Sequence, residues 1–226
     1  ELPRHASTQM TLNSVSGVKA AEKLGYTRVV LGRELSKDEI DEIAENTRLQ
    51  LEVFVHGALC VSVSGQCYMS SLFGGRSGNR GLCAQPCRLD FSVDGRHNIM
   101  SLKDGSIVGR LPELPRITSF KIEGRMKRPE YVACAVDACR RSLDGEAYDA
   151  ERLAGIFSRG GLTEGYFDGT MSGMQGIRGK DDVENSVSAL KGIKELYKAE
   201  YPRYELNIKV KIKRGESICA SGTYSG

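Results

Sequence analysis

Four cysteines crowd into 28 consecutive residues and restrict what this chain can fold into. They form a C-x6-C pair and a C-x3-C pair joined by a glycine-rich loop, and they follow an apolar segment typical of a buried strand: Cys60, Cys67, Cys83 and Cys87. Cysteines in globular chains are usually scattered small hydrophobes. The clustering therefore predicts thiolates that converge on one centre.

The spacing of these thiols bears on which centre they would hold. Thiolates exclude the hard cations that prefer oxygen ligands. Structural zinc favours C-x2-C pairs, which are absent here, whereas the looser spacing leaves room for a larger cluster. We expect an iron-sulfur cluster, with zinc as the alternative and purely structural cysteines as a third reading.

Composition places the chain among globular proteins. Of its 226 residues, 40% are apolar and 27% are charged, and no apolar run approaches the roughly 18 residues of a membrane span. The seven cysteines are odd in number and clustered, which argues against a disulfide framework. We therefore expect a cytoplasmic protein with no membrane segment.

Positive charge is concentrated in the middle of the chain. Residues 76–141 contain 13 Lys and Arg against 7 Asp and Glu, although the whole chain carries only +3. Such a segment would suit RNA or another anionic substrate. A solvated basic face explains the charge equally well.

Strand-like and helix-like segments alternate along the first two thirds of the chain. The strand-like segments are continuously apolar, as in a parallel sheet buried on both faces. They lie at residues 2–7, 28–31, 51–55 and 117–122, and helices are predicted at 15–24, from the Ser36 cap onward and at 129–141. Cys134 and Cys139 fall on the last helix and read as core residues.

The chain changes character after Asp144. Residues 146–200 are predicted to be a glycine-rich segment followed by a helix at 185–197. Residues 204–213 alternate apolar and polar side chains, which indicates a half-exposed antiparallel strand. We expect residues 201–226 to begin a C-terminal β domain.

Three stretches of the sequence resemble one known family. They are E-V-F-V-H-G-A-L-C with G-Q-C-Y-M-S after it (residues 52–70), H-A-S-T-Q (5–9) and F-K-I-E-G-R-M-K (120–127). Together they are similar to the signature of the U32 peptidases, the collagenase-like proteins. The string F-S-R-G-G-L-T-E-G-Y-F (157–167) resembles the branch that hydroxylates cytidine in ribosomal RNA.

The resemblance implies an α/β fold based on a (β/α)8 barrel, which needs eight strands. Four are visible, so residues 1–145 are expected to be the later half of a TIM-like barrel, with the N-terminal half missing. Open edges would then expose apolar strand residues to water. The expected exposed residues are Val29, Val30, Leu31, Val53 and Phe54.

In such a barrel the working groups stand at the carboxyl ends of the strands. The polar residues at these ends are therefore the candidate site. We expect catalytic roles for His5, His56 and Glu123, and substrate binding by Gln9, Arg33, Glu34, Lys121 and Arg125.

The resemblance also implies a cofactor and a co-substrate. The hydroxylating relatives are expected to hold a [4Fe-4S] cluster, and three of its ligands match Cys60, Cys67 and Cys83. At the place of the fourth ligand this chain has Ser106. Cys87 is the natural substitute, and an exogenous ligand on an open iron is the other possibility.

The function expected from these features is hydroxylation of a base in ribosomal or transfer RNA, with prephenate as hydroxyl donor. The two carboxylates of prephenate would suit Arg33, Lys121 and Arg125. A collagenase-like peptidase is the alternative, in which Cys60 and His56 would be nucleophile and base. No H-E-x-x-H or G-x-S-x-G motif supports it. A non-catalytic RNA-binding module is the third reading.

Overall fold

The computed structural model describes residues 2–124, 127–198, 205–213, 215 and 219–225. It divides into two compact units, Glu1–Ile193 and Lys194–Gly226. The first unit carries all the candidate site residues and is built on one mixed sheet. The second is a short hairpin unit.

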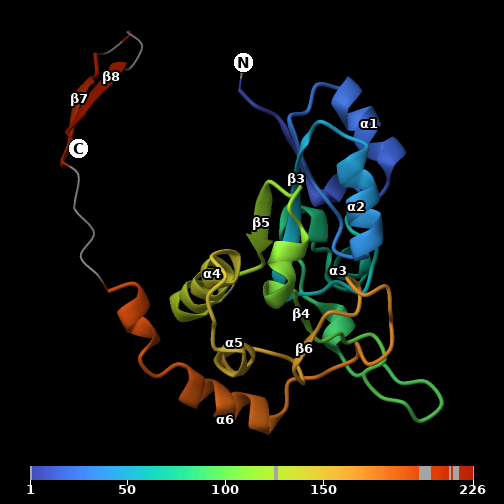
Figure 1. Cartoon of the computed structure of the whole chain (residues 1–226). Helices are drawn as coiled ribbons and strands as arrows, with labels where there is room; N and C mark the ends of the chain where they lie inside the picture. Colours follow the sequence, from blue (N-terminus) through green and yellow to red (C-terminus); the bar gives the residue numbers. More distant parts are fainter. Residues whose placement is uncertain (1, 125–126, 199–204, 214, 216–218, 226) are drawn as a thin grey trace. The chain divides into compact units, whose positions relative to one another are not determined.

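Four parallel strands form the centre of the sheet (Figure 1). They are β1 (His5–Ala6), β2 (Arg28–Val30), β3 (Gln50–Ala58) and β5 (Ser119–Ile122). β3 pairs with β2 and with β5, with Val29 opposite Leu51 and Val53 opposite Phe120. All four predicted strands are therefore present, although β1 is shorter than expected.

Two further strands extend the sheet beyond the end of β3. β4 (Asp104–Ser106) pairs antiparallel with residues 56–58 of β3, and β6 (Leu162–Thr163) pairs parallel with β4. Within the described residues the sheet does not close into a barrel. The structure is thus a mixed α/β fold, and the half-barrel remains a prediction.

Helices follow the strands as the alternation predicts. α1 (Val15–Lys23) and α2 (Lys37–Glu45) lie side by side, and α4 (Pro129–Leu143) follows β5 (Figure 1). Ser36 caps α2 as predicted, and Glu39 completes a capping box with it. Proline at the first position of α4 leaves no backbone donor unsatisfied there.

One apolar core joins these helices to the sheet. Val29, Val30, Leu31 and Val53 are between 0% and 6% exposed, so the prediction that they lie open to water is wrong. Val29, Leu31 and Val53 join residues of α1, α2 and α4 in a single cluster on the helix-covered face of the sheet. Val30 lies beside Glu52 on the other face. Phe54 also lies on that other face and is only half-buried.

The segment that carries the four clustered cysteines, residues 60–87, has little regular structure and is called the cysteine segment below. It contains α3 (Met69–Gly74) and two 3-10 turns, Gly78–Arg80 and Pro86–Arg88. Asp94 and Gly95, both at positive φ, form a turn across which Val93 pairs with Arg96. Cys134 and Cys139 are buried in the core, as predicted.

The helix predicted at 185–197 is wrong in its bounds. α5 (Ala150–Ile156) is followed by α6 (Lys180–Ala189), and a separate 3-10 helix covers Ile193–Leu196. Asp181 and Asp182 stabilise the N-terminus of α6 through the helix dipole. Gly192 has a φ of 74° and cannot continue the helix.

The second unit contains the predicted antiparallel strand. β7 (Glu205–Lys211) pairs with β8 (Cys219–Ser225), and Ile208 and Val210 are exposed. Whether this hairpin begins a larger β domain remains a prediction. No helix among the described residues is long and apolar enough to cross a membrane.

The capping box of α2 provides a test of the fold. We expect Ser36→Ala to lower the free energy of unfolding by about 1 kcal/mol, because the Glu39 amide loses its acceptor. Ser36→Thr keeps the hydroxyl and should stay close to the wild type. Urea unfolding of the three proteins measures this, and equal losses in both variants would show that the cap does not stabilise α2.

Candidate functional site

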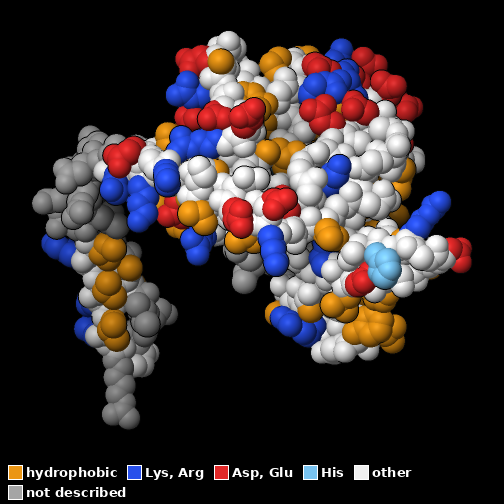
Figure 2. All heavy atoms as spheres, turned by 90° about the horizontal axis from the view of Figure 1, so that it is seen from below, with side chains coloured by type: hydrophobic (Ala, Val, Ile, Leu, Met, Phe, Trp, Pro, Cys, Tyr) orange, Lys and Arg blue, Asp and Glu red, His pale blue; other side chains and the backbone are white. Residues whose placement is uncertain are grey.

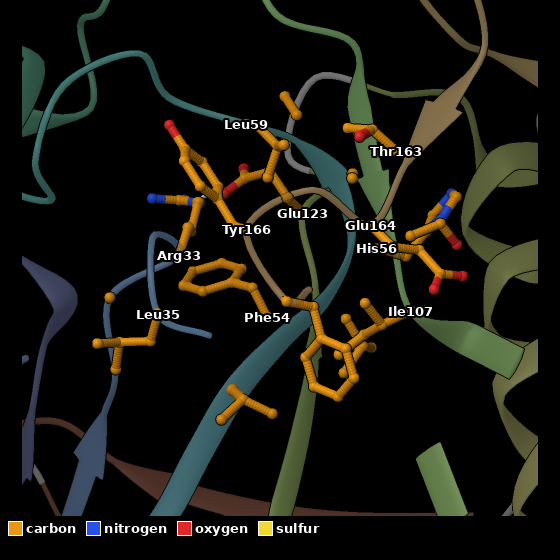
Figure 3. A pocket seen from close by; sticks show the side chains of 18 of the residues that line it. Arg33, Leu35, Phe54, His56, Leu59, Ile107, Glu123, Thr163, Glu164 and Tyr166 are labelled. Atoms are coloured by element: carbon orange, nitrogen blue, oxygen red, sulfur yellow. Dashed lines mark hydrogen bonds and ion pairs between the residues drawn. The ribbon is translucent and has the colours of Figure 1, made fainter. Parts of the chain in front are cut away.

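The carboxyl end of β3 borders a pocket (Figure 3). The pocket combines residues from the ends of β2, β3 and β5 with residues of β4 and of the segment after β6. Its polar and aromatic lining consists of Arg33, Phe54, His56, Ser106, Glu123, Thr163, Glu164, Tyr166 and Phe167. Three of the predicted site residues, Arg33, His56 and Glu123, therefore lie together.

Arg33 and Glu123 form an ion pair inside this pocket. The Arg33 Nη2 atom donates to the Glu123 Oε2 atom at 2.6 Å, and both side chains are largely buried. The guanidinium also stacks on the Phe54 ring, with 3.9 Å between its Cζ atom and the ring centroid. Figure 3 shows the pair between the rings of Phe54 and Tyr166.

His56 is 2% exposed and neutral at physiological pH. Burial and the positive charge of Lys127 lower the pKa of its imidazole from 6.5 to about 4. Its Nδ1 atom lies 3.1 Å from the Ser106 Oγ atom, and its Nε2 atom is buried with no hydrogen-bond partner among the described residues. The ring packs on Tyr131 at 5.4 Å between centroids. A neutral imidazole with one free nitrogen can exchange a hydrogen bond with a bound substrate.

Gly57 allows the strand ends to come this close. A Cβ atom at this position would lie 2.5 Å from the Glu123 carbonyl oxygen, and the residue has a φ of 123°. Only glycine combines that conformation with so close an approach of two backbones. Gly57 therefore fixes the position of Glu123 beside His56.

Glu34 and Gln9 contact the cysteine segment and are not pocket residues. The Glu34 carboxylate accepts hydrogen bonds from the Ser64 amide and hydroxyl and from the Asn13 side chain. Gln9 donates to the Asn79 carbonyl oxygen at 2.5 Å. Both residues thus tie the ends of β1 and β2 to the cysteine segment.

Two other predicted site residues, His5 and Lys121, do not line the pocket. His5 is exposed on β1. Lys121 pairs with Glu52 at 3.0 Å on the open face of the sheet. Burial acts to raise the pKa of Glu52, but hydrogen bonds from Lys121 and Ser119 outweigh it and hold that pKa below its usual value. Arg125 lies outside the described residues.

The four clustered thiols are free and lie near one another. Burial raises the pKa of Cys87, and the nearby thiols of Cys60, Cys83 and Cys67 raise it further, while Arg88 acts in the opposite direction. Among the described residues, no three Cys, His, Asp or Glu side chains lie close enough together to hold a single metal ion. The loop joins the pocket, since the Tyr166 hydroxyl donates to the Cys60 carbonyl oxygen.

Charges on the face shown in Figure 2 are mixed. Lys and Arg side chains stand singly there, with Asp and Glu among them, and no continuous basic surface is visible.

Sequence reasoning did not single out Phe54, Tyr166 or Ser106 as parts of the pocket. Tyr166 and Glu164 belong to the string at 157–167, which signalled their importance without indicating where they would lie. Phe54 was expected only as an apolar strand residue exposed at an open edge of the sheet. Its role became visible only in the structure, where its ring packs against the Arg33 guanidinium. It lies there on the open face of the sheet, the face opposite the helix-covered one.

The fold and site define an α/β protein with a polar pocket at strand ends and a four-cysteine segment beside it. The family model described as peptidase family U32 matches residues 1–175. The chain belongs to this family.

Curated relatives carry two kinds of name. The chain is 40% identical over 173 residues to the 23S rRNA 5-hydroxycytidine C2501 synthase of Escherichia coli, covering 72% of this chain and 26% of that protein. It is 37% identical to tRNA hydroxylation protein P1 of Bacillus subtilis, over 66% of this chain and 39% of the relative. A collagenase of Porphyromonas gingivalis is 31% identical over 98% of this chain and 61% of its own length.

The chain thus spans between about a quarter and three fifths of the length of these relatives. No solved structure matches it.

The titration of His56 should be visible in the pH dependence of the free energy of unfolding. Its pKa is about 4 in the folded protein and 6.5 when exposed, so the unfolded chain binds more protons between these values. The contribution of the neutral ring, about 3 kcal/mol, is complete above pH 6.5 and is lost as pH falls toward 4. Urea unfolding across this range should show the loss.

His56→Phe keeps a ring against Tyr131 and should remove this part of the pH dependence. The exposed residue His5 provides the matched control, because His5→Phe should retain the wild-type profile. An unchanged profile for His56→Phe would contradict the assignment.

Proposed function

We propose that this chain is part of an iron-sulfur enzyme that hydroxylates a base in ribosomal or transfer RNA. The observation that carries the proposal is the group of four neighbouring thiols next to a buried polar pocket. The names of the relatives from Escherichia coli and Bacillus subtilis support RNA as the substrate.

The thiols suit a cluster better than a single zinc ion. Zinc would draw its sulfur ligands to about 2.3 Å from one centre, and no such tight group exists among the described residues. In a [4Fe-4S] cluster each thiolate binds a different iron atom, so neighbouring but separated sulfurs suffice. When bound, the cluster would supply electron transfer or activation of the hydroxyl donor.

Cys87 is our choice for the fourth ligand. Burial raises its pKa, and Cys60, Cys83 and Cys67 raise it further, which supports Cys87 as a neighbour of the other three thiols. Ser106 lies instead against His56 on β4. The hydroxyl group of Ser106 therefore serves the pocket, and the cysteine segment can supply four thiolates by itself.

Within the pocket the protein groups have separate roles. His56 would hydrogen-bond the substrate through its free Nε2 atom. Arg33 would offer its remaining donors to an acidic co-substrate, proposed to be prephenate, while Glu123 and Phe54 hold the guanidinium in place. Lys121 is engaged by Glu52, so its charge is already balanced on the open face.

A peptidase is the second candidate, favoured by the contact between His56 and Ser106 and by the collagenase name of one relative. Cys60 is not the hydrogen-bond partner of His56, so the expected Cys–His pair lacks support. A serine nucleophile needs a basic imidazole oriented by a carboxylate. His56 has a pKa lowered to about 4, and its Nε2 atom has no partner.

The cluster assignment is tested by anaerobic purification. The full-length protein should be brown and hold iron and sulfide in equal amounts. Cys87→Ser should lose most of the iron, whereas Cys134→Ala, a change in the core, should keep it. A colourless protein with stoichiometric zinc would overturn the assignment.

The reaction is tested in cells. Deleting the gene should remove a hydroxylated nucleoside from digests of total RNA, and plasmid copies of the wild type and of Cys134→Ala should restore it. Cys67→Ser should not. Peptide cleavage by the pure protein that is abolished by Ser106→Ala would favour the peptidase instead.

A further inference from the structure

Three cations surround the ring of Phe157. Lys127 lies over the Phe157 ring, and the Cζ atoms of Arg178 and Arg159 lie 4.3 Å and 5.1 Å from its centroid. Phe157 in turn packs edge-on against Tyr131. These cations come from separate parts of the chain, so the fold itself brings them together.

Negative charge near these cations is limited. Asp104 is 1% exposed and pairs with Arg159 at 2.6 Å, and its Oδ2 atom has no partner. Asp182 approaches the same segment, but its Oδ2 atom accepts from the backbone amides of Gly160 and Gly179. One buried carboxylate thus faces several cations.

Arg88 is a fourth cation close to these three. Arg88 is a half-buried side chain that donates to the carbonyl oxygens of Leu59 and Leu102. Burial and the charges of Arg159, Arg178 and Arg88, opposed by Asp104, lower the pKa of Lys127 to about 7, so these side chains act on one another electrostatically. Against Asp104, the three arginines leave an excess of two positive charges among the described residues, and Lys127 adds a third when it is protonated.

Gathering like charges in a partly buried place is costly unless a counter-charge joins them. Arg33 and Lys121 have their own carboxylates, Glu123 and Glu52. Lys127 and Arg178 have no carboxylate partner in the described part of the chain, and each keeps donors for a ligand. Arg guanidinium groups bind carboxylates and phosphates through paired hydrogen bonds.

We propose that Lys127, Arg159 and Arg178 form an oxyanion-binding site, with Asp104 and Arg88 as positioning residues. The ligand is a carboxylate or phosphate group. It would be anchored between the cysteine segment, which Arg159 reaches through Gln85, and the Tyr131 ring, whose other neighbour is His56. A molecule held there by its anionic group can extend toward the pocket.

Two sources can supply such a group, a small dicarboxylic acid and the RNA backbone. Titration calorimetry of the full chain at low salt should use succinate, inorganic phosphate and a single-stranded oligoribonucleotide as probes. We expect saturable binding of at least one probe with one site per chain. Succinate alone indicates a small acid, and binding of phosphate with the oligonucleotide indicates the backbone.

Lys127→Met and Arg178→Gln should each weaken that binding tenfold or more. If the backbone is the ligand, each should also lower the salt dependence of oligonucleotide binding by about one charge. Lys19→Met on α1 and Arg140→Gln on α4 remove exposed charges elsewhere and should bind like the wild type. Arg159 is not substituted, because its loss would leave the buried Asp104 carboxylate without its ion-pair partner.

Equal weakening in the control variants, or no binding of any probe, would overturn the proposal. Thermal unfolding of each variant verifies that it is folded before binding is measured. The readout is binding alone, so a failure here leaves RNA hydroxylation untouched, and a failure of that function leaves this result valid.

Discussion

A bulge in β3 determines where the site lies. The pairing of β3 with β5 shifts between Phe54 and His56. Without that shift, strict alternation would place His56 on the open face with Glu52 and Phe54. The shift turns His56 into the interior against Tyr131, and Val55, His56 and Gly57 are all buried in succession. The neutral imidazole depends on this one irregularity.

Local patterns predicted the strands and most helices because each depends on near neighbours in sequence. The apolar runs of β2 and β3, the Ser36 cap and Pro129 at the start of α4 are such signals. Which face of a strand is covered depends on distant helices, so the expected exposure of Val29 was wrong. The break at Gly192 rests on a single φ angle, which residue type alone does not reveal.

The sequence indicated which residues belong to the site better than it indicated which of them pair with one another. Strand ends correctly brought Arg33, His56 and Glu123 together. Arg33 and Glu123 are 90 positions apart in the sequence, so no local pattern encodes their contact. The cations around Phe157 illustrate the same limit, because their segments are adjacent only in space.

The open face of the sheet carries its own counter-charges. Glu52 on β3 pairs with Arg28 of β2 and Lys121 of β5, and Ser119 donates to the same carboxylate. When ions of opposite charge leave water together, their mutual attraction offsets part of the hydration free energy that they lose. A lone ion has no such compensation. This layer can therefore be wetted by solvent or covered by another polypeptide with little change in its internal bonding, and either environment is compatible with the same side-chain arrangement.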